Sequence, residues 1–176
     1  MAGLTLKSLS QTRWKSRIES VKAIKFQAPQ IRYALLQLAQ TSEDPKIKSE
    51  ADCLATYEIE SFEFFLGMTI WYDILFAVNS ISKNLQSKDM HIDVAIDQLK
   101  GLISYFKGYR ENGFISTMNS SKKIVLKLEI EPVFCEKRII HRKKQLDENV
   151  HNETTCSAKE SFRIDYLQYI VDKAIS

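Results

Sequence analysis

The sequence predicts an all-α fold, an irregular bundle of about six helices around a long buried central helix. The chain has only five Gly and three Pro in 176 residues, whereas a β-sandwich needs a turn signal about every 8 to 12 residues. Apolar residues make up 44% of the chain, which is enough to bury a core. One stretch, Tyr57 to Ser87, is apolar nearly all round beyond Trp71, as in a buried helix. We therefore expect residues 1–176 to form a single helical domain.

Charge and cysteine usage restrict the class of protein only slightly. The net charge of +3 is too small to indicate a partner. The three cysteines form no CxxC pair and are odd in number, so we expect no disulfide framework and a reducing compartment. The N-terminal residues include no apolar stretch of the kind that a secretory signal needs.

The first helix is expected to begin near Ser8 or Ser10 and to carry one apolar and several basic faces. Either a phosphate-facing surface or an ordinary solvated face fits this charge, which only Glu19 opposes. Pro29 should break the run, because it lacks an amide hydrogen, and a shorter helix should follow with Ile31, Leu35 and Leu38 inward. The basic residues are Lys7, Arg13, Lys15, Arg17, Lys22, Lys25 and Arg32, and the apolar ones are Trp14, Ile18, Val21 and Ile24.

The next helix has a strong start signal, because Asp44 can cap it and Pro45 suits its first position. It should lead into the central helix, which keeps a polar stripe at Thr56, Glu60, Glu63 and Gly67 and ends around Gln86 to Lys88. The central helix is long enough to span a membrane. Glu63 and Asp73 interrupt its apolar run, and no stop-transfer pattern follows. We therefore expect a core helix and no membrane partner.

After the central helix, Asp89 is expected to cap a helix with an apolar repeat at steps of three and four. Asn112 and Gly113 should stop that helix in the left-handed conformation. Tyr105, Phe106 and Tyr109 resemble an aromatic box, but at this spacing we interpret them as core and rim. The repeat comprises Ile92, Ile96, Leu99, Ile103 and Phe106.

The C-terminal third contains a helix, a polar loop and a last helix. Residues 114–130 fit a helix that Pro132 ends, although 126–131 also alternate like a strand. Ser157 and Glu160 have capping-box spacing, and the apolar face beyond them uses Phe162, Tyr166, Tyr169 or Ile170, and Ala174. This helix has no stop signal before Ser176, so we expect the reading frame to be truncated.

Residues 136–156 form the most polar part of the chain and are expected to be a basic, then acidic loop inside the domain. A surface loop, a nucleic-acid contact and a nuclear-import signal all fit its composition. Its basic cluster comprises Lys137, Arg138, His141, Arg142, Lys143 and Lys144.

The search for catalytic chemistry is negative. The chain has no GxxxxGK[ST], GxGxxG, HExxH or GxSxG motif. Cys135, His141, His151 and Cys156 match no zinc spacing, so we expect no metal and no cofactor. Asp73 is a single carboxylate, for which a buried hydrogen bond or ion pair is the expected role rather than acid–base catalysis. We expect no enzymatic activity and no small-molecule substrate.

A family resemblance is carried by LKSLSQTRWKSRIESVKAI, residues 6–24, and by SFEFFLGMTIWYDILFAVNSISKNLQSKDMHIDVAIDQLKGL, residues 61–102. These segments resemble the "LS-x-TRW" and "FEF…W…SK-x-LQ" blocks of hAT-type transposases, in the branch of transposase-derived proteins like zinc finger MYM-type protein 1. KRIIHRKKQLDENVHN resembles the linker before the family's "FR…Y…I-x-D-x-A-I" block, found here at 162–175. The resemblance covers nearly the whole chain in order and spacing.

The resemblance implies that this chain is the helical insertion of a ribonuclease-H-like transposase, without the family's Asp, Asp and Glu. It therefore implies a catalytically inactive fragment of a domesticated or decayed transposase, with a nuclear location. Its nucleic-acid contacts would be Arg13, Trp14, Lys15, Arg17, Lys137, Arg138, Arg142, Lys143 and Lys144. The rival hypothesis is a helical module with no DNA role, which uses apolar surface exposed by truncation for a protein partner or for self-association.

Overall fold

The computed structural model describes residues 14–135 and 156–176, and their side chains from residue 17 onward. The helices are α1 (Trp14–Thr41), α2 (Pro45–Cys53), α3 (Phe62–Leu85), α4 (Ile92–Leu126), α5 (Ala158–Phe162) and α6 (Tyr169–Ile175). Two π-helical turns, η1 (Leu54–Glu58) and η2 (Arg163–Gln168), continue α2 and join α5 to α6. The predicted all-α class is confirmed, with five continuous helical segments in the described ranges.

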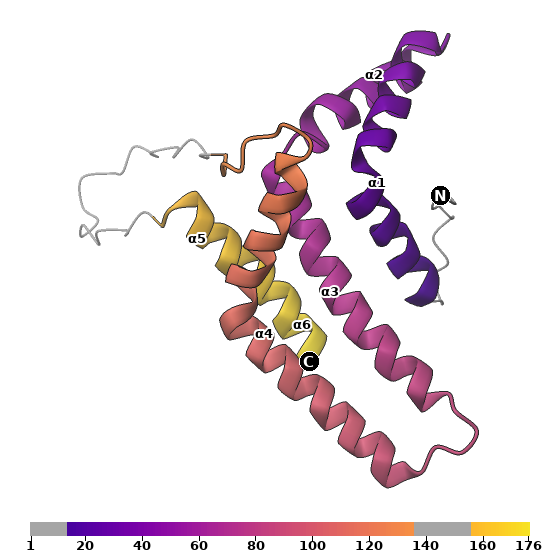
Figure 1. Ribbon diagram of the computed structural model, residues 1–176, viewed down its shortest axis with the longest axis vertical. Coiled ribbons are helices and arrows are strands. Elements are labelled where there is room, and N and C mark those ends of the chain that lie inside the picture. The colour runs from indigo at the N-terminus through magenta and orange to yellow at the C-terminus, as the bar shows by residue number, and fades with distance from the viewer. Residues whose placement is uncertain (1–13, 136–155) are drawn as a thin grey trace, which may run out of the picture.

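The long helices α3 and α4 form an antiparallel hairpin, and the remaining helices cover one half of it (Figure 1). α1 packs along α3, and the segment from α5 to α6 packs against α4 and α3. Near the loop between α3 and α4, the hairpin extends beyond the other helices (Figure 1). The hairpin therefore lies in a bundle at one end and forms a two-helix arm at the end with the loop.

The core lies where α3 meets the covered half of α4 and the C-terminal helices. Phe65, Leu66 and Ile70 of α3 are fully buried, and Phe106 and Val125 of α4 are at most 1% exposed. α3 is thus the central helix, as predicted. Its length and apolar composition also suit a membrane span, with 44% of its most apolar window buried inside the fold.

Two predicted start signals are confirmed. The Asp44 carboxylate accepts a hydrogen bond of 2.8 Å from the Lys46 amide, and Pro45 occupies the first position of α2. The Ser157 hydroxyl accepts one of 3.3 Å from the Glu160 amide at the start of α5. In each case the side chain satisfies an amide that has no partner within the helix.

Two helix starts differ from prediction. α3 does not continue from residue 57, because Ser61 has extended backbone and caps a new helix, accepting from the Phe64 amide at 3.4 Å. The predicted polar stripe is therefore split between η1, which holds Thr56, the turn that holds Glu60, and α3. Asp89 is not a cap either: it lies in the turn before α4, whose cap position is His91.

The expected break at Pro29 is a kink instead. α1 runs through Pro29, and Gln27 has non-helical angles of φ −121° and ψ 21°. Proline removes one backbone hydrogen bond and its ring displaces the preceding turn, which neighbouring contacts tolerate here. Ile31 and Leu35 pack against the core, but Leu38 is 44% exposed, because Ala39 instead is buried beside α2.

The expected stop at Gly113 is wrong, since α4 continues for a further three turns. The ring of Tyr109 lies over Gly113, where a Cβ atom would be 2.6 Å from Cδ2 of that ring. The glycine therefore serves packing within the helix and does not end it. α4 ends at Leu126, before the predicted end at Pro132, with Glu129 in the left-handed region (φ 59°) and the Ile130 amide bonded to the Val125 carbonyl at 3.0 Å.

The predicted apolar face of the last helix is only partly right. Phe162, Tyr166 and Ile170 pack against the core, but Leu167 and Val171 are its fully buried members. The π-helical turn η2, which contains Tyr166 and Leu167, shifts the register of the helix. This shift leaves Ala174 exposed.

Candidate functional site

Most of the residues predicted to contact nucleic acid lie outside the described part of the chain. This applies to Arg13 and to the predicted loop cluster Lys137, Arg138, Arg142, Lys143 and Lys144. Trp14 and Lys15 form the start of α1, of which only the backbone is described, and Arg17 is exposed. The nucleic-acid surface therefore stays a prediction.

The basic first helix contributes Arg32 and Lys25 to contacts within the fold. Arg32 pairs with Glu60, and its Nε donates to the Ala55 carbonyl at 3.3 Å. Lys25 places its Nζ 4.5 Å from the centroid of the Tyr72 ring, a cation–π contact. These two cations join α1 to the turn before α3 and to α3 itself, which reduces the charge available to an anionic partner.

A polar network lies between α1, α3 and α4. The Tyr109 hydroxyl donates to the Asp73 carboxylate at 3.2 Å and shares a hydrogen bond of 2.9 Å with the Thr117 hydroxyl. Burial raises the pKa of Asp73, and the positive charge of Lys25 partly offsets the shift. Burial likewise lowers the pKa of Lys25. Asp73 is thus a half-buried carboxylate that is hydrogen-bonded to a neighbouring helix, the role that its sequence position predicts.

This network does not form a recognisable reaction centre. It holds one carboxylate, and burial also raises the pKa of Tyr109 far above its ordinary value, so the phenol stays protonated. A metal site needs several converging ligands, and among the residues that the structure describes no three His, Cys, Asp or Glu side chains come together. The geometry favours a structural role, which fixes the contact between three helices.

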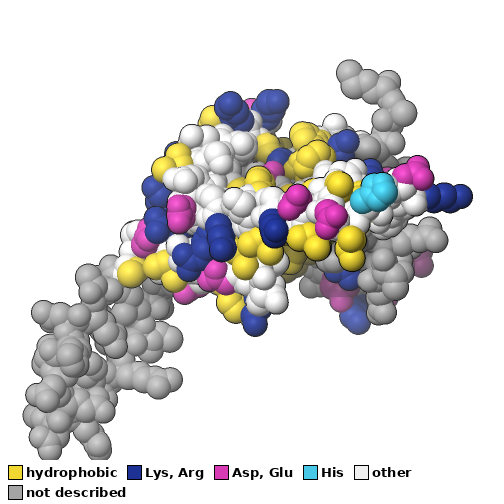
Figure 2. Space-filling view, turned by 90° about the horizontal axis from the view of Figure 1, so that it is seen from below, with side chains coloured by type: hydrophobic (Ala, Val, Ile, Leu, Met, Phe, Trp, Pro, Cys, Tyr) yellow, Lys and Arg dark blue, Asp and Glu magenta, His cyan; other side chains and the backbone are white. Residues whose placement is uncertain are grey.

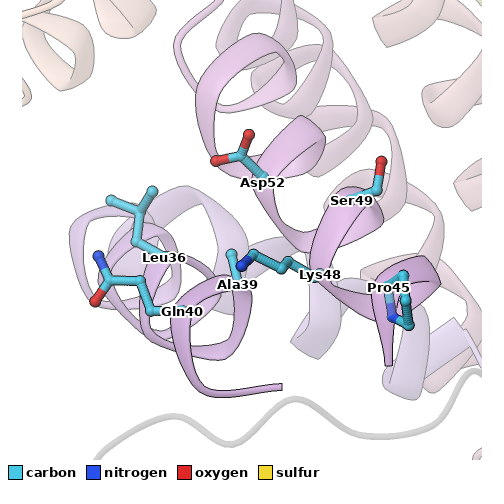
Figure 3. Close-up of a pocket in the computed structure, with 7 residues that line it drawn as sticks. All are labelled: Leu36, Ala39, Gln40, Pro45, Lys48, Ser49 and Asp52. Carbon is cyan, nitrogen blue, oxygen red and sulfur yellow. The ribbon is translucent and has the colours of Figure 1, made fainter. Parts of the chain in front are cut away.

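An open pocket of about 570 Å³ lies between α1 and α2 (Figure 3). Gln40 and Asp52 line it from opposite helices, with Lys48 and Ser49 beside Asp52 on α2. Its walls combine the apolar side chains of Leu36, Ala39 and Pro45 with polar side chains that are open to solvent. Ligand sites usually enclose most of the ligand surface, whereas this pocket is open to solvent, so it is a weak candidate for a binding site.

The first half of α4 carries four exposed apolar side chains on one helix face. We call Ile92, Ile96, Leu99 and Ile103 the α4 stripe; they are 75%, 44%, 44% and 40% exposed. Their spacing of four, three and four residues places them in one line along the helix. The repeat is one helix face, as the sequence predicts, but no other helix in the described ranges covers this part of it.

The same line is covered one turn further along α4. Phe106, the next residue of the repeat, is only 1% exposed. Arg110 then bonds to Asp172 of α6 through two hydrogen bonds, of 2.7 and 3.2 Å. The C-terminal helix thus covers the line near Arg110, and its end marks where the uncovered stripe begins (Figure 1).

Charged side chains flank the α4 stripe. Asp93 and Lys100 directly follow Ile92 and Leu99 and are seven residues apart, so both lie on the same side of the stripe. Lys100 also approaches Asp97 of its own helix, with Nζ 3.6 Å from a carboxylate oxygen and both side chains more than 70% exposed. Figure 2, seen from this end of the molecule, shows apolar and charged side chains side by side on the surface.

No family model, curated protein or solved structure matches the chain.

Proposed function

We propose that the chain is a non-catalytic helical module that acts by self-association through the α4 stripe. The observation that carries the proposal is the exposure of all four stripe residues, from 40% to 75%, on a helix whose other half buries one face in the core. Isolated apolar side chains are normal on a protein surface, but a contiguous line of them marks an interface.

The two-helix arm leaves the α4 stripe without a helix packed against it, so burial of the stripe requires a partner. The residues between the stripe and α3, such as Ala95 and Leu102, are half-buried against the hairpin, while the stripe faces away from it. Helical bundles bury such a line with further helices. A second hairpin supplies two helices at once, and two copies together complete a four-helix arrangement.

A second copy fits the stripe because its spacing reads the same in both directions. The intervals of four, three and four residues place Ile92 against Ile103 and Ile96 against Leu99 when an identical helix runs the opposite way. In a two-fold dimer each patch must match itself in this manner. The stripe meets that requirement without any change in the fold.

The test is sedimentation equilibrium of the full chain and of the variant Ile96→Glu. We expect the native chain to form dimers and the variant to associate at least about tenfold more weakly, because the interface would bury an unpaired carboxylate. Raising sodium chloride from about 0.1 M to about 1 M should leave the native association in place, since its driving force is apolar. A chain that stays monomeric would refute the proposal.

Ile115→Glu is the matched control. Ile115 lies on the same helix and is 66% exposed, but it is not part of the stripe. It should leave the association unchanged, and circular dichroism should show the same helix content for all three proteins. Equal weakening by both substitutions would place the interface elsewhere.

DNA contact is the second candidate function, in keeping with the resemblance to hAT transposases and with the nuclear location that it implies. The observation that favours it is the exposure of Arg17 and Lys22 on α1. Fluorescence anisotropy with a labelled DNA duplex tests it. Binding should weaken steeply with salt, and Arg17→Glu with Lys22→Glu should abolish it; salt-independent binding, or none, would contradict DNA contact.

A further inference from the structure

We infer that the second copy runs antiparallel to the first along α4, with Asp93 of each chain opposite Lys100 of the other. The inference rests on the proposed self-association and adds its direction and register. The two-fold axis then passes between Asp97 and Gln98, midway along the α4 stripe. Asp93 and Lys100 become the residues that select the partner.

The charges distinguish an antiparallel pair from a parallel one. A two-fold axis perpendicular to both helices brings the same side of each helix together, with the directions reversed. Asp93 and Lys100 share that side, and the register that matches the stripe with itself places the carboxylate of one near the ammonium of the other. Symmetry then creates the same pair twice.

A parallel pair offers no such contact. In a parallel pair, the side of one helix that carries Asp93 and Lys100 would face the other side of the stripe on the partner helix. The equivalent positions on that side are Ala95 and Leu102, which supply no charge. Parallel pairing would also place the α3–α4 hairpins in the same direction, without cross-chain ion pairs beside the stripe. The charge pattern therefore favours the antiparallel arrangement.

Both charged groups are available for this role. The Lys100 and Asp97 side chains are 73% and 77% exposed, and an exposed pair of this kind contributes little to stability. Lys100 can therefore exchange its contact within the helix for one across the interface. Asp93 lies in the first turn of α4, where a negative charge also suits the helix dipole.

Charge reversal tests the pairing. Asp93→Lys and Lys100→Asp, made separately, each place like charges opposite one another twice per dimer. Each should weaken self-association roughly three- to thirtyfold at low salt, by the usual strength of exposed pairs. The double variant, which exchanges the two charges, should recover native association to within about threefold. A merely structural role for either residue would not produce this recovery.

Mixed disulfides test the direction independently. Cys53, Cys135 and Cys156 are free and exposed, so they are first replaced by Ser. Chains carrying Ile96→Cys and chains carrying Leu99→Cys should form a disulfide dimer when mixed under mild oxidation, and far less when each is oxidised alone. A parallel pair would instead crosslink each variant to itself.

The outcomes separate the two proposals. If Ile96→Glu prevents self-association but the double charge variant does not recover it, and crosslinks form equally within each variant, the antiparallel pairing is overturned while self-association stands. If the native chain is monomeric at every concentration, both fail. Recovery together with crosslinking only in the mixture establishes the antiparallel register.

Discussion

The two halves of α4 follow one apolar repeat but have different surroundings. In the first half, Leu99 is 44% exposed, and in the second, Phe106 is 1% exposed. The two residues are seven positions apart, so they lie on nearly the same side of the helix. The difference lies in the neighbours, because the C-terminal helices cover only the second half. Periodicity thus specifies a helix face, whereas burial depends on which other segment reaches it.

The largest expected effect comes from truncating Phe106 and Leu99 in separate variants. Phe106→Ala should lower the free energy of unfolding by about 3 to 5 kcal/mol, because it leaves a cavity in a close-packed core. Leu99→Ala should lower it by less than about 1.5 kcal/mol in the monomer, because that side chain is already partly in water. Urea denaturation of dilute protein measures both. Equal losses would show that the first half is also covered in the monomer.

The glycines of α4 sharpen the comparison. A Cβ added at Gly113 would lie 2.6 Å from the Tyr109 ring, whereas one added at Gly101 meets nothing within 4 Å. Gly113→Ala should therefore destabilise the fold by about 1 to 3 kcal/mol through overpacking. Gly101→Ala, the matched control, should stabilise it by about 0.5 to 1 kcal/mol through helix propensity. Thermal unfolding of dilute samples compares the two, and a stabilising Gly113→Ala would contradict the packing described for Tyr109.

The sequence predicted the fold class because helical periodicity and capping are local properties. Asp44 and Ser157 cap helices as expected, since a capping side chain acts within three residues. Gly113 misled the prediction, because its local signal for a helix end is overridden by the tertiary burial of Phe114 and Thr117 further along α4. Local pattern alone does not reveal such an override.

The candidate site was less accessible to sequence analysis. The stripe residues were recognised as one face, but their exposure depends on where α6 lies, which is a long-range contact. The partners of Asp73 are also distant in the chain: Lys25 precedes it by 48 residues, and Tyr109 follows it by 36. A polar residue in an apolar helix predicts a contact with another side chain, but it does not indicate which side chain that is. Signals of that kind predict that a partner exists without naming it.

The smallest expected effect concerns pH, at the border between the two halves of α4, where Tyr109 meets Asp73. Burial raises the pKa of Asp73 in the folded chain, so the folded state binds its proton more readily than the unfolded state does. Protonation of Asp73 should therefore raise the free energy of unfolding as the pH falls from neutral through the raised pKa. This stabilisation is complete below the ordinary value of 3.8.

Asp73→Asn isolates this effect, because the amide keeps an oxygen that accepts from Tyr109 but does not titrate. As the pH is lowered, the unfolding free energy of the native chain should rise relative to that of the variant. The shift should be modest, because Asp73 is partly open to water, which screens it. Urea denaturation between about pH 7 and pH 4 measures it, and a shift toward the variant would mean that Lys25 dominates the site and lowers the pKa of Asp73.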